Sequence, residues 1–162
     1  TVSDLSPLSS LRFLSFLVVA DTTQLHTLRG LENLRDPEKP ESPPVLWIQL
    51  YRNAVLEDVS ALSMPRLRSF YLQDGNTSLA NLVLGPVEEV DAVYLTNAVD
   101  VVRFAAPSLR AIHDVLDISG TPLCEVDLPA LRELGTLNYL VDPPCWPQEE
   151  QDALLAQTQP AE

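Results

Sequence analysis

The segment Pro107-Ser108-Leu109-Arg110-Ala111-Ile112 decides the fold, because the chain repeats its form at a fixed spacing. Pro-x-Leu-Arg-x-apolar occurs again at 65–70 and at 129–134, and a degenerate copy begins at Pro86. The four prolines, at positions 65, 86, 107 and 129, are 21, 21 and 22 residues apart. Prolines scattered among surface loops would not keep such a period, so the sequence indicates an internal repeat.

Short alternating runs follow the same period. Apolar-x-apolar runs lie at 17–19, 48–50, 70–72, 93–95 and 116–118, with Leu140 as a weaker sixth. Their second members are 31, 22, 23, 23 and 22 residues apart. A further anchor follows each run, at Leu25, Leu56, Leu79, Val101 and Leu123, and the next step of 22 reaches Cys145. A helical protein would instead show apolar residues three and four apart, so these runs favour short strands.

This spacing predicts a right-handed parallel solenoid of about six coils, each with a strand and a return segment. One coil cannot bury its own leucines, but stacked coils line them into continuous interior ladders. The chain holds 29 leucines among its 162 residues, enough for several such ladders. Each buried leucine contributes roughly 1.5 to 3 kcal/mol, so we expect these ladders to supply most of the stability.

We predict a single domain over 1–162, closed at both ends by caps. Residues 1–16 are expected to form the N-terminal cap, and 145–156 a C-terminal cap with a short helix that begins near Pro147. Trp146, Leu154 and Leu155 would cover the last coil. The proline-rich insertion 36–44 lengthens the first interval to 31 residues. It is interpreted either as a solvated excursion or as a binding loop.

The stretch from Leu116 through Pro122-Leu123 to Leu131 resembles the repeat of bacterial receptor-L-domain-like proteins, a branch of the leucine-rich repeat proteins. The segments 8–11 and 30–34 are similar to internalin-type leucine-rich repeats. The resemblance implies an α/β repeat solenoid at the bacterial cell envelope, with a binding or structural role and no shared catalytic residues. Such repeats usually carry an asparagine ladder, which this chain keeps at Asn53 and Asn76. Because Thr22, Ala98 and Thr121 replace it elsewhere, we do not expect a regular ladder.

The repeat phase predicts which side chains leave the outer face of the sheet. They include five aromatic residues: Trp47, Tyr51, Tyr71, Tyr94 and Tyr139. Strands lie about 4.8 Å apart, so Tyr71 and Tyr94 should stack as a cross-strand pair. Two interpretations stay open. The aromatic residues either form a partner-binding patch, to which tyrosine and tryptophan are well suited, or they only stabilise the sheet or meet a neighbouring domain.

Cys124 and Cys145 lie almost one coil apart. Equivalent positions in adjacent coils approach to about 4.8 Å, a separation that a disulfide can bridge. The alternative is that Cys145 is a buried thiol in a leucine position. The two cysteines lack metal-ligand spacing and have no histidine beside them, so we expect no zinc site.

Charge and motifs exclude several function classes. With a formal charge of −13, the chain is a poor candidate for nucleic-acid binding, and no apolar run is long enough to span a membrane. The isolated His26 and His113 have no nucleophile in phase, and we find no phosphate-binding glycine loop. Carboxylate clusters at 57–58, 88–91, 114–117 and 125–127 match no calcium-loop pattern and are expected to form a solvated acidic face. We therefore predict no enzyme, no cofactor and no metal.

The leading hypothesis is a non-enzymatic module that binds a protein or a glycan through the exposed sheet face. The alternative is a structural or assembly domain of a larger cell-envelope protein. The chain begins at Thr1 and its only methionine is Met64, which fits either a shortened chain or removal of a targeting peptide. The second interpretation, together with a disulfide, predicts a location outside the cytoplasm. The oligomeric state stays open.

Overall fold

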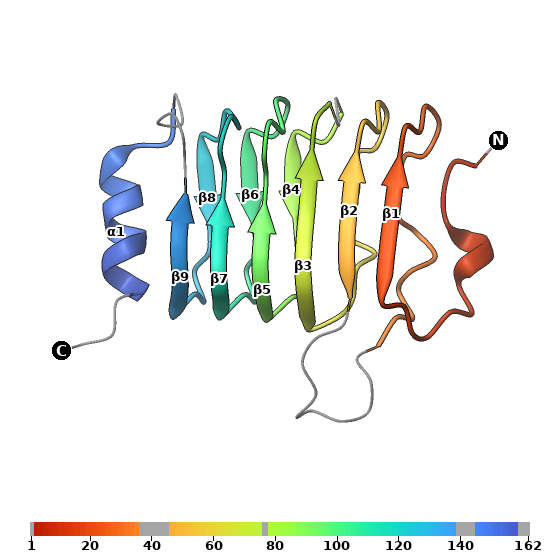
Figure 1. The fold of residues 1–162 in the computed structure, drawn as a ribbon, viewed down its shortest axis with the longest axis horizontal. Helices are drawn as coiled ribbons and strands as arrows, with labels where there is room; N and C mark the ends of the chain where they lie inside the picture. The colour runs from red at the N-terminus through yellow and green to blue at the C-terminus, as the bar shows by residue number, and fades with distance from the viewer. Residues whose placement is uncertain (1, 36–45, 76–77, 139–144, 159–162) are drawn as a thin grey trace.

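The computed structural model describes residues 2–35, 46–75, 78–138 and 145–158, which form a parallel β-solenoid with a C-terminal helix (Figure 1). A six-stranded sheet has the order β1-β2-β3-β5-β7-β9, and a three-stranded sheet behind it has the order β4-β6-β8. All paired strands are parallel. The strands of the larger sheet are β1 (Phe16–Ala20), β2 (Trp47–Tyr51), β3 (Arg66–Gln73), β5 (Glu89–Tyr94), β7 (Ala111–Asp117) and β9 (Glu133–Asn138). The smaller sheet contains β4 (Asn81–Val83), β6 (Arg103–Ala105) and β8 (Glu125–Asp127).

The predicted solenoid of parallel strands is confirmed, and the register places equivalent residues opposite one another. Ile48, Phe70, Val93, Leu116 and Leu137 are successive partners along the larger sheet. The first four of these side chains are fully buried. Side chains alternate between the two faces of a strand. The residues directly before and after each anchor on its own strand therefore point to the outer face of the sheet.

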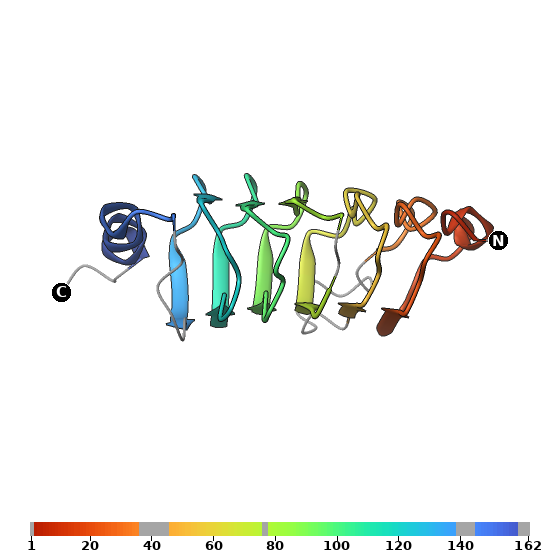
Figure 2. The ribbon, with the colours of Figure 1, turned by 90° about the horizontal axis from the view of Figure 1, so that it is seen from above.

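The smaller sheet was missed by the sequence prediction, which placed only a return segment there. Its signal is a second pattern, in which apolar residues occupy 79, 82, 84 and 87, then 101, 104, 106 and 109, then 123, 126, 128 and 131. Val126 is only partly buried, and the others are buried. The central residues of the three strands are all apolar: Leu82, Phe104 and Val126. Figure 2 shows these strands forming the back of successive coils, with the core between the two sheets.

The Pro-x-Leu-Arg motif marks the turn that leads into a strand of the larger sheet. Its leucines, Leu67, Leu109 and Leu131, are fully buried, whereas the prolines before them are exposed. The arginine after Leu109 donates from its Nη2 to Glu88 Oε2 of the preceding coil at 2.5 Å. In this copy the motif therefore combines a turn-forming proline, a core leucine and an arginine that contacts the neighbouring coil.

Both ends of the core are covered. At the N-terminus, the short 3-10 helix η1 (Ser6–Leu8) is tied to the coil after β1, because the Leu5 amide donates to Arg29 O at 2.7 Å. At the C-terminus, α1 (Gln148–Thr158) lies beside β9 (Figure 1), with Trp146 and Leu154 buried and Leu155 half-buried. The proline-rich segment 36–44 lies outside the described residues.

A β-bulge in β7 shifts the register of the last strand. Ile112 faces Leu134 while Val115 faces Thr136, so β7 holds one residue more than β9 between these pairs. The extra residue leaves His113 and Asp114 both exposed. As a result Leu137 is opposite Leu116 and lies 21 residues after it, one fewer than the step of 22 on which the predicted sixth run at Leu140 depends. Leu140 itself lies outside the described residues.

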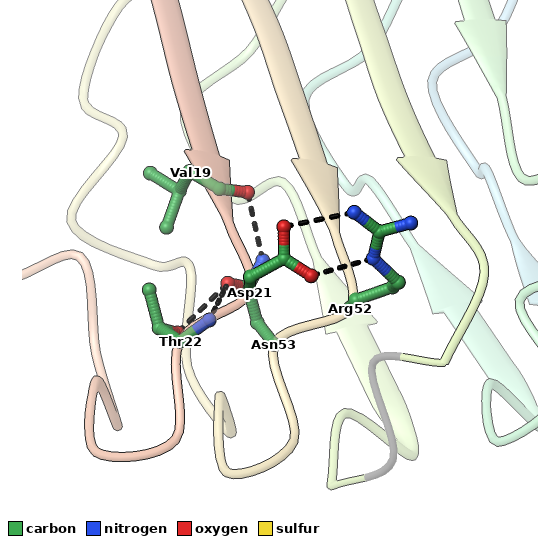
Figure 3. Close-up of polar contacts among 5 residues, drawn as sticks. All are labelled: Val19, Asp21, Thr22, Arg52 and Asn53. Atoms are coloured by element: carbon green, nitrogen blue, oxygen red, sulfur yellow. Dashed lines mark hydrogen bonds and ion pairs between the residues drawn. The ribbon is translucent and has the colours of Figure 1, made fainter.

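The turn after each strand of the larger sheet repeats a left-handed residue. Positive φ angles occur at Asp21, Arg52, Asp74, Asn97 and Gly120, each two residues after a strand anchor. Such angles strain a side-chain-bearing residue. Two of these turns are bridged directly, since Arg52 donates from Nε and Nη2 to the two carboxylate oxygens of Asp21 at 2.6 and 2.8 Å (Figure 3). This pairing holds the pKa of the Asp21 carboxyl below its usual range.

A buried polar side chain follows the left-handed residue and bonds to the coil before it. The fully buried Asn53 donates from Nδ2 to Val19 O at 2.9 Å and accepts from Thr22 Oγ1 at 2.8 Å (Figure 3). Thr121 occupies the equivalent position and donates from Oγ1 to Leu95 O. Thr121 therefore makes the bond to the preceding coil that Asn53 makes. Ala98, at the equivalent position of a coil between them, has no side-chain donor. Asn76 lies outside the described residues.

The bulge generates a prediction about Gly135. A Cβ atom there would lie 2.3 Å from Asp114 O and 2.7 Å from His113 O, both rigid backbone atoms. We expect Gly135→Ala to lower the free energy of unfolding by about 1–3 kcal/mol, the range typical of overpacking. Gly85→Ala is the matched control, because nothing lies within 4 Å of its Cβ position. Urea denaturation measures both, and equal midpoints would contradict the packing described here.

The buried asparagine provides a second prediction. Asn53→Ala removes the bonds to the Val19 carbonyl and to Thr22, and we expect a loss of about 1–3 kcal/mol in unfolding free energy because both hydrogen bonds of a buried side chain are lost. Asn53→Thr should recover part of this loss, since Thr121 makes the equivalent bond. Asn33→Ala, at a site whose amide bonds an exposed carbonyl, should change stability little. Equal losses for Asn53→Ala and Asn53→Thr would show that packing, and not the hydrogen bond, sets the effect.

Candidate functional site

Four aromatic side chains form a continuous row across the outer face of the larger sheet. The aromatic row consists of Phe16, Trp47, Tyr71 and Tyr94, one from each of β1, β2, β3 and β5. Successive ring centroids are 6.0, 5.8 and 4.5 Å apart. The contacts connect strands that are neighbours in the sheet, so the row runs across the strands along the solenoid axis.

The register explains how the row is built. Phe16 is directly opposite Trp47, and Tyr71 is directly opposite Tyr94. The middle contact is diagonal, because the residue opposite Tyr71 is Gln49 and not Trp47. Long aromatic side chains reach such diagonal neighbours.

The rings differ in how they are presented to solvent. Tyr71 and Tyr94 are stacked, with an angle of 7° between their planes, so the predicted cross-strand stack is confirmed. Trp47 is tilted by 44° to Phe16 and by 42° to Tyr71. Phe16 is 51% exposed, whereas the other three residues are half-buried. The row therefore presents a mostly apolar ridge with phenol groups at one end.

Arginine side chains lie over two rings of the same face. The guanidinium of Arg68 is 5.5 Å from the ring centroid of Trp47, and that of Arg52 is 5.0 Å from the ring centroid of Tyr51. These distances are those of cation–π contacts. Tyr51 therefore lies against Arg52 at the end of β2, beside the row and not within it.

The other end of the row is acidic. The pKa of the Tyr94 phenol is raised, first by partial burial and then by Tyr71 and by the carboxylates of Asp114 and Asp117. Asp117 is the register partner of Tyr94 on β7. Its carboxylate accepts a hydrogen bond from the Ser119 amide at 2.9 Å, while Asp114 is exposed at the bulge. At the Phe16 and Trp47 end the outer face is therefore apolar, with an arginine beside it. At the Tyr94 end it presents phenol groups beside carboxylates.

The structure brings Trp47, Tyr71 and Tyr94 together, as the sequence predicted, and adds Phe16. Sequence analysis missed Phe16 because it stands at the start of its strand, before the first apolar anchor. The step of 31 residues from Phe16 to Trp47 equals the step from Val19 to Leu50, and this equality was the available signal. Tyr139 lies outside the described residues.

The two cysteines are joined by a disulfide. Cys124 and Cys145 have their Cα atoms 4.5 Å apart, and Cys145 immediately precedes the buried Trp146. Of the two alternatives, a disulfide or a buried Cys145 thiol, the structure therefore shows the disulfide. The bridge connects the segment before β8 to the segment that leads into α1.

The remaining acidic and histidine groups act between coils or face solvent. Arg103 Nε donates to Glu125 Oε1 at 2.8 Å, and His113 Nδ1 lies 3.0 Å from Glu133 Oε1. Within the ranges that the structure describes, no group of three or more potential metal ligands occurs. None of the helices in those ranges is long and apolar enough to cross a membrane.

Comparison with known proteins gives no relative for this chain: no family model, no curated protein and no solved structure matches it. The functional argument therefore depends on the geometry of the aromatic row and its surroundings.

The disulfide predicts a measurable contribution to stability. Replacing both cysteines by serine should lower the free energy of unfolding by about 3 kcal/mol, because the bridge restricts the unfolded chain. A thiol assay on the oxidised protein, denatured without reductant, should find no free thiol. Two free thiols per chain would contradict the bridge.

Proposed function

We propose that the chain is a non-enzymatic protein-binding module whose aromatic row, Phe16, Trp47, Tyr71 and Tyr94, is the contact surface. The single observation that supports this proposal is the continuity of the row over four adjacent strands on one face. Aromatic side chains bring large contact areas with few rotatable bonds, and they dominate the energetic centres of protein interfaces.

The orientation of the rings favours a protein over a glycan. Sugars bind aromatic residues by stacking on an open ring face. Tyr71 and Tyr94 are stacked on each other, which covers one face of each, and Arg68 lies over Trp47. What the row offers is ring edges, phenol groups and aliphatic surface. These fit the side chains of a protein partner, which pack around edges and donate to hydroxyls.

The charges beside the row indicate what such a partner carries. Asp114 and Asp117 flank Tyr94, so basic side chains of the partner would lie at that end. The whole chain has a formal charge of −13, which steers a basic surface toward it. We therefore propose a partner with an apolar contact strip bordered by lysine or arginine, whose binding weakens as the salt concentration rises.

The repeat class and the location of the protein are also part of this proposal. We propose that the solenoid is of the leucine-rich, L-domain-like class and works outside the cytoplasm at a bacterial cell envelope. The Pro-x-Leu-Arg repeats support the first, and the Cys124–Cys145 disulfide supports the second, because such bridges persist in oxidising compartments.

The test uses Trp47 as a reporter within the row. Trp146→Phe leaves Trp47 as the only tryptophan, and its emission reports contact at the row. The probes are peptides enriched from a displayed random library on the wild-type chain, and cellohexaose and chitohexaose as glycans. We expect the peptides to change Trp47 emission and the oligosaccharides to have no effect. An emission change with the oligosaccharides alone would overturn the preference for a protein.

The matched variants locate the contact. Tyr71→Ala with Tyr94→Ala should weaken peptide binding at least about tenfold, the effect of losing interface hot spots. Val99→Ala, which shortens an exposed apolar side chain in a turn away from the row, should leave affinity unchanged. Circular dichroism checks that the double variant is folded. Equal affinities for wild type and the folded double variant would remove the row as the binding site.

A further inference from the structure

The first strand of the larger sheet has an open edge. β1 pairs with β2 alone among the described strands. The Ser15 carbonyl accepts from the Trp47 amide and the Asp21 amide donates to Tyr51 O, so the odd-numbered residues of β1 face β2. Alternate residues of a parallel strand bond to the same neighbour. The backbone groups of Phe16, Val18 and Ala20 therefore point away from β2.

The N-terminal segment contacts a different part of the first coil. The Leu5 amide donates to Arg29 O and the His26 amide donates to Ser3 O, both in the segment after β1. Figure 1 shows the η1 segment beside β1, and Figure 2 shows it at the level of the back of the coils, away from the front edge of β1. An open strand edge of this kind pairs readily with another strand.

The side chains on this edge are apolar and exposed. Phe16 is 51% exposed and Val18 is 43% exposed, and Phe13 just before the strand is 57% exposed. Phe16, Val18 and Ala20 share the outer face, because alternate residues of a strand do. Phe13, Phe16 and Val18 therefore form an exposed apolar surface at one end of an acidic chain.

The charge distribution favours a second copy of the chain as the occupant. Residues 1–35 hold three carboxylates (Asp4, Asp21, Glu32) and three arginines (Arg12, Arg29, Arg35), for a net charge of zero. The whole chain has 23 carboxylates and 10 basic residues, so residues 36–162 have 20 and 7, and the entire −13 lies there. The N-terminal ends therefore add no net charge of their own to a contact between two such acidic chains, and the remaining repulsion comes from the more distant coils.

The two ends of the solenoid differ, which restricts how copies can associate. α1 lies beside β9 and carries Glu149, Glu150 and Asp152. Among the described strands β9 pairs only with β7 and its residues are largely exposed, so a head-to-tail contact would bring the apolar edge of β1 to the acidic end that α1 forms. Pairing of N-terminal end with N-terminal end instead joins two segments without net charge, and it closes as a twofold dimer.

We propose that β1 pairs antiparallel with β1 of a second copy around a twofold axis through Val18, joining the two larger sheets into one. In this arrangement Val18 faces Val18 of the second copy, and each Phe16 faces an Ala20. The large ring of Phe16 thus lies opposite the small side chain of Ala20. The outward backbone groups of residues 16, 18 and 20 then form the inter-strand hydrogen bonds, and the two aromatic rows lie on one continuous face.

The first test measures the oligomeric state of the 162-residue chain by sedimentation over a range of concentrations. We expect a reversible dimer that strengthens as salt rises, because salt screens the two acidic bodies. Val18→Lys places two like charges opposite each other and should raise the dimer dissociation constant at least about tenfold. Val99→Lys makes the same charge change at a residue that is 56% exposed, and it should leave the dimer intact.

Several outcomes of this test would overturn the proposal. They are a wild-type chain that stays monomeric throughout the range, equal effects of Val18→Lys and Val99→Lys, and assemblies that keep growing beyond two copies. The Tyr71→Ala and Tyr94→Ala double variant should still dimerise, so failure of the protein-binding function and failure of the dimer are separable.

The second test checks the twofold geometry. Both native cysteines are in the disulfide, so Val18→Cys introduces a single free thiol. A short bismaleimide should then link two chains through position 18 with high yield. Val102→Cys, at a residue that is 41% exposed, is the matched control and should give little dimer. A chain that sediments as a dimer but is not linked through position 18 would exclude the pairing through β1.

Discussion

Parallel hydrogen bonding between successive coils holds equivalent residues about 4.8 Å apart, and the other features of this protein depend on that spacing. It converts a period in the sequence into neighbours in space. Ile48, Phe70, Val93 and Leu116 become one buried ladder, and Tyr71 and Tyr94 become a stacked pair. Arg110 reaches Glu88, and Cys124 reaches Cys145, because each partner lies about one coil away along the chain. A single constraint thus sets the core, the outer face and the covalent bridge.

The period was enough to predict the larger sheet, its inward leucines and the Tyr71–Tyr94 stack, because these follow from repetition alone. Departures from repetition were not predictable. The bulge at His113 and Asp114 adds one residue, and the chain compensates with Gly135 opposite it, so a constant step misplaces the last ladder position. β4, β6 and β8 were missed because three residues are too few to show alternation, and their phase appears only when three coils are aligned. Phe16 was missed because it precedes the first clear anchor.

The acidity of the chain is accommodated by its shape. The solenoid is elongated (Figure 2). Carboxylates pair with arginines of neighbouring coils, as in Asp21–Arg52, Glu88–Arg110 and Glu125–Arg103. Such exposed pairs contribute little to stability individually, yet they prevent like charges from being stacked at the coil spacing. The buried polar groups contribute differently. Asn53 and Thr121 place their polar side chains in the interior, where both donate to carbonyls of the preceding coil.

The position of the disulfide has a consequence for proteolysis. Cys124 and Cys145 close a covalent ring that contains β8, β9 and the segment leading to the C-terminal cap. A protease that cuts one peptide bond inside this ring opens it without releasing either fragment, so α1 stays attached to the body and continues to cover the last coil. A nicked molecule would therefore keep both its closed end and its outer face until the bridge is also reduced.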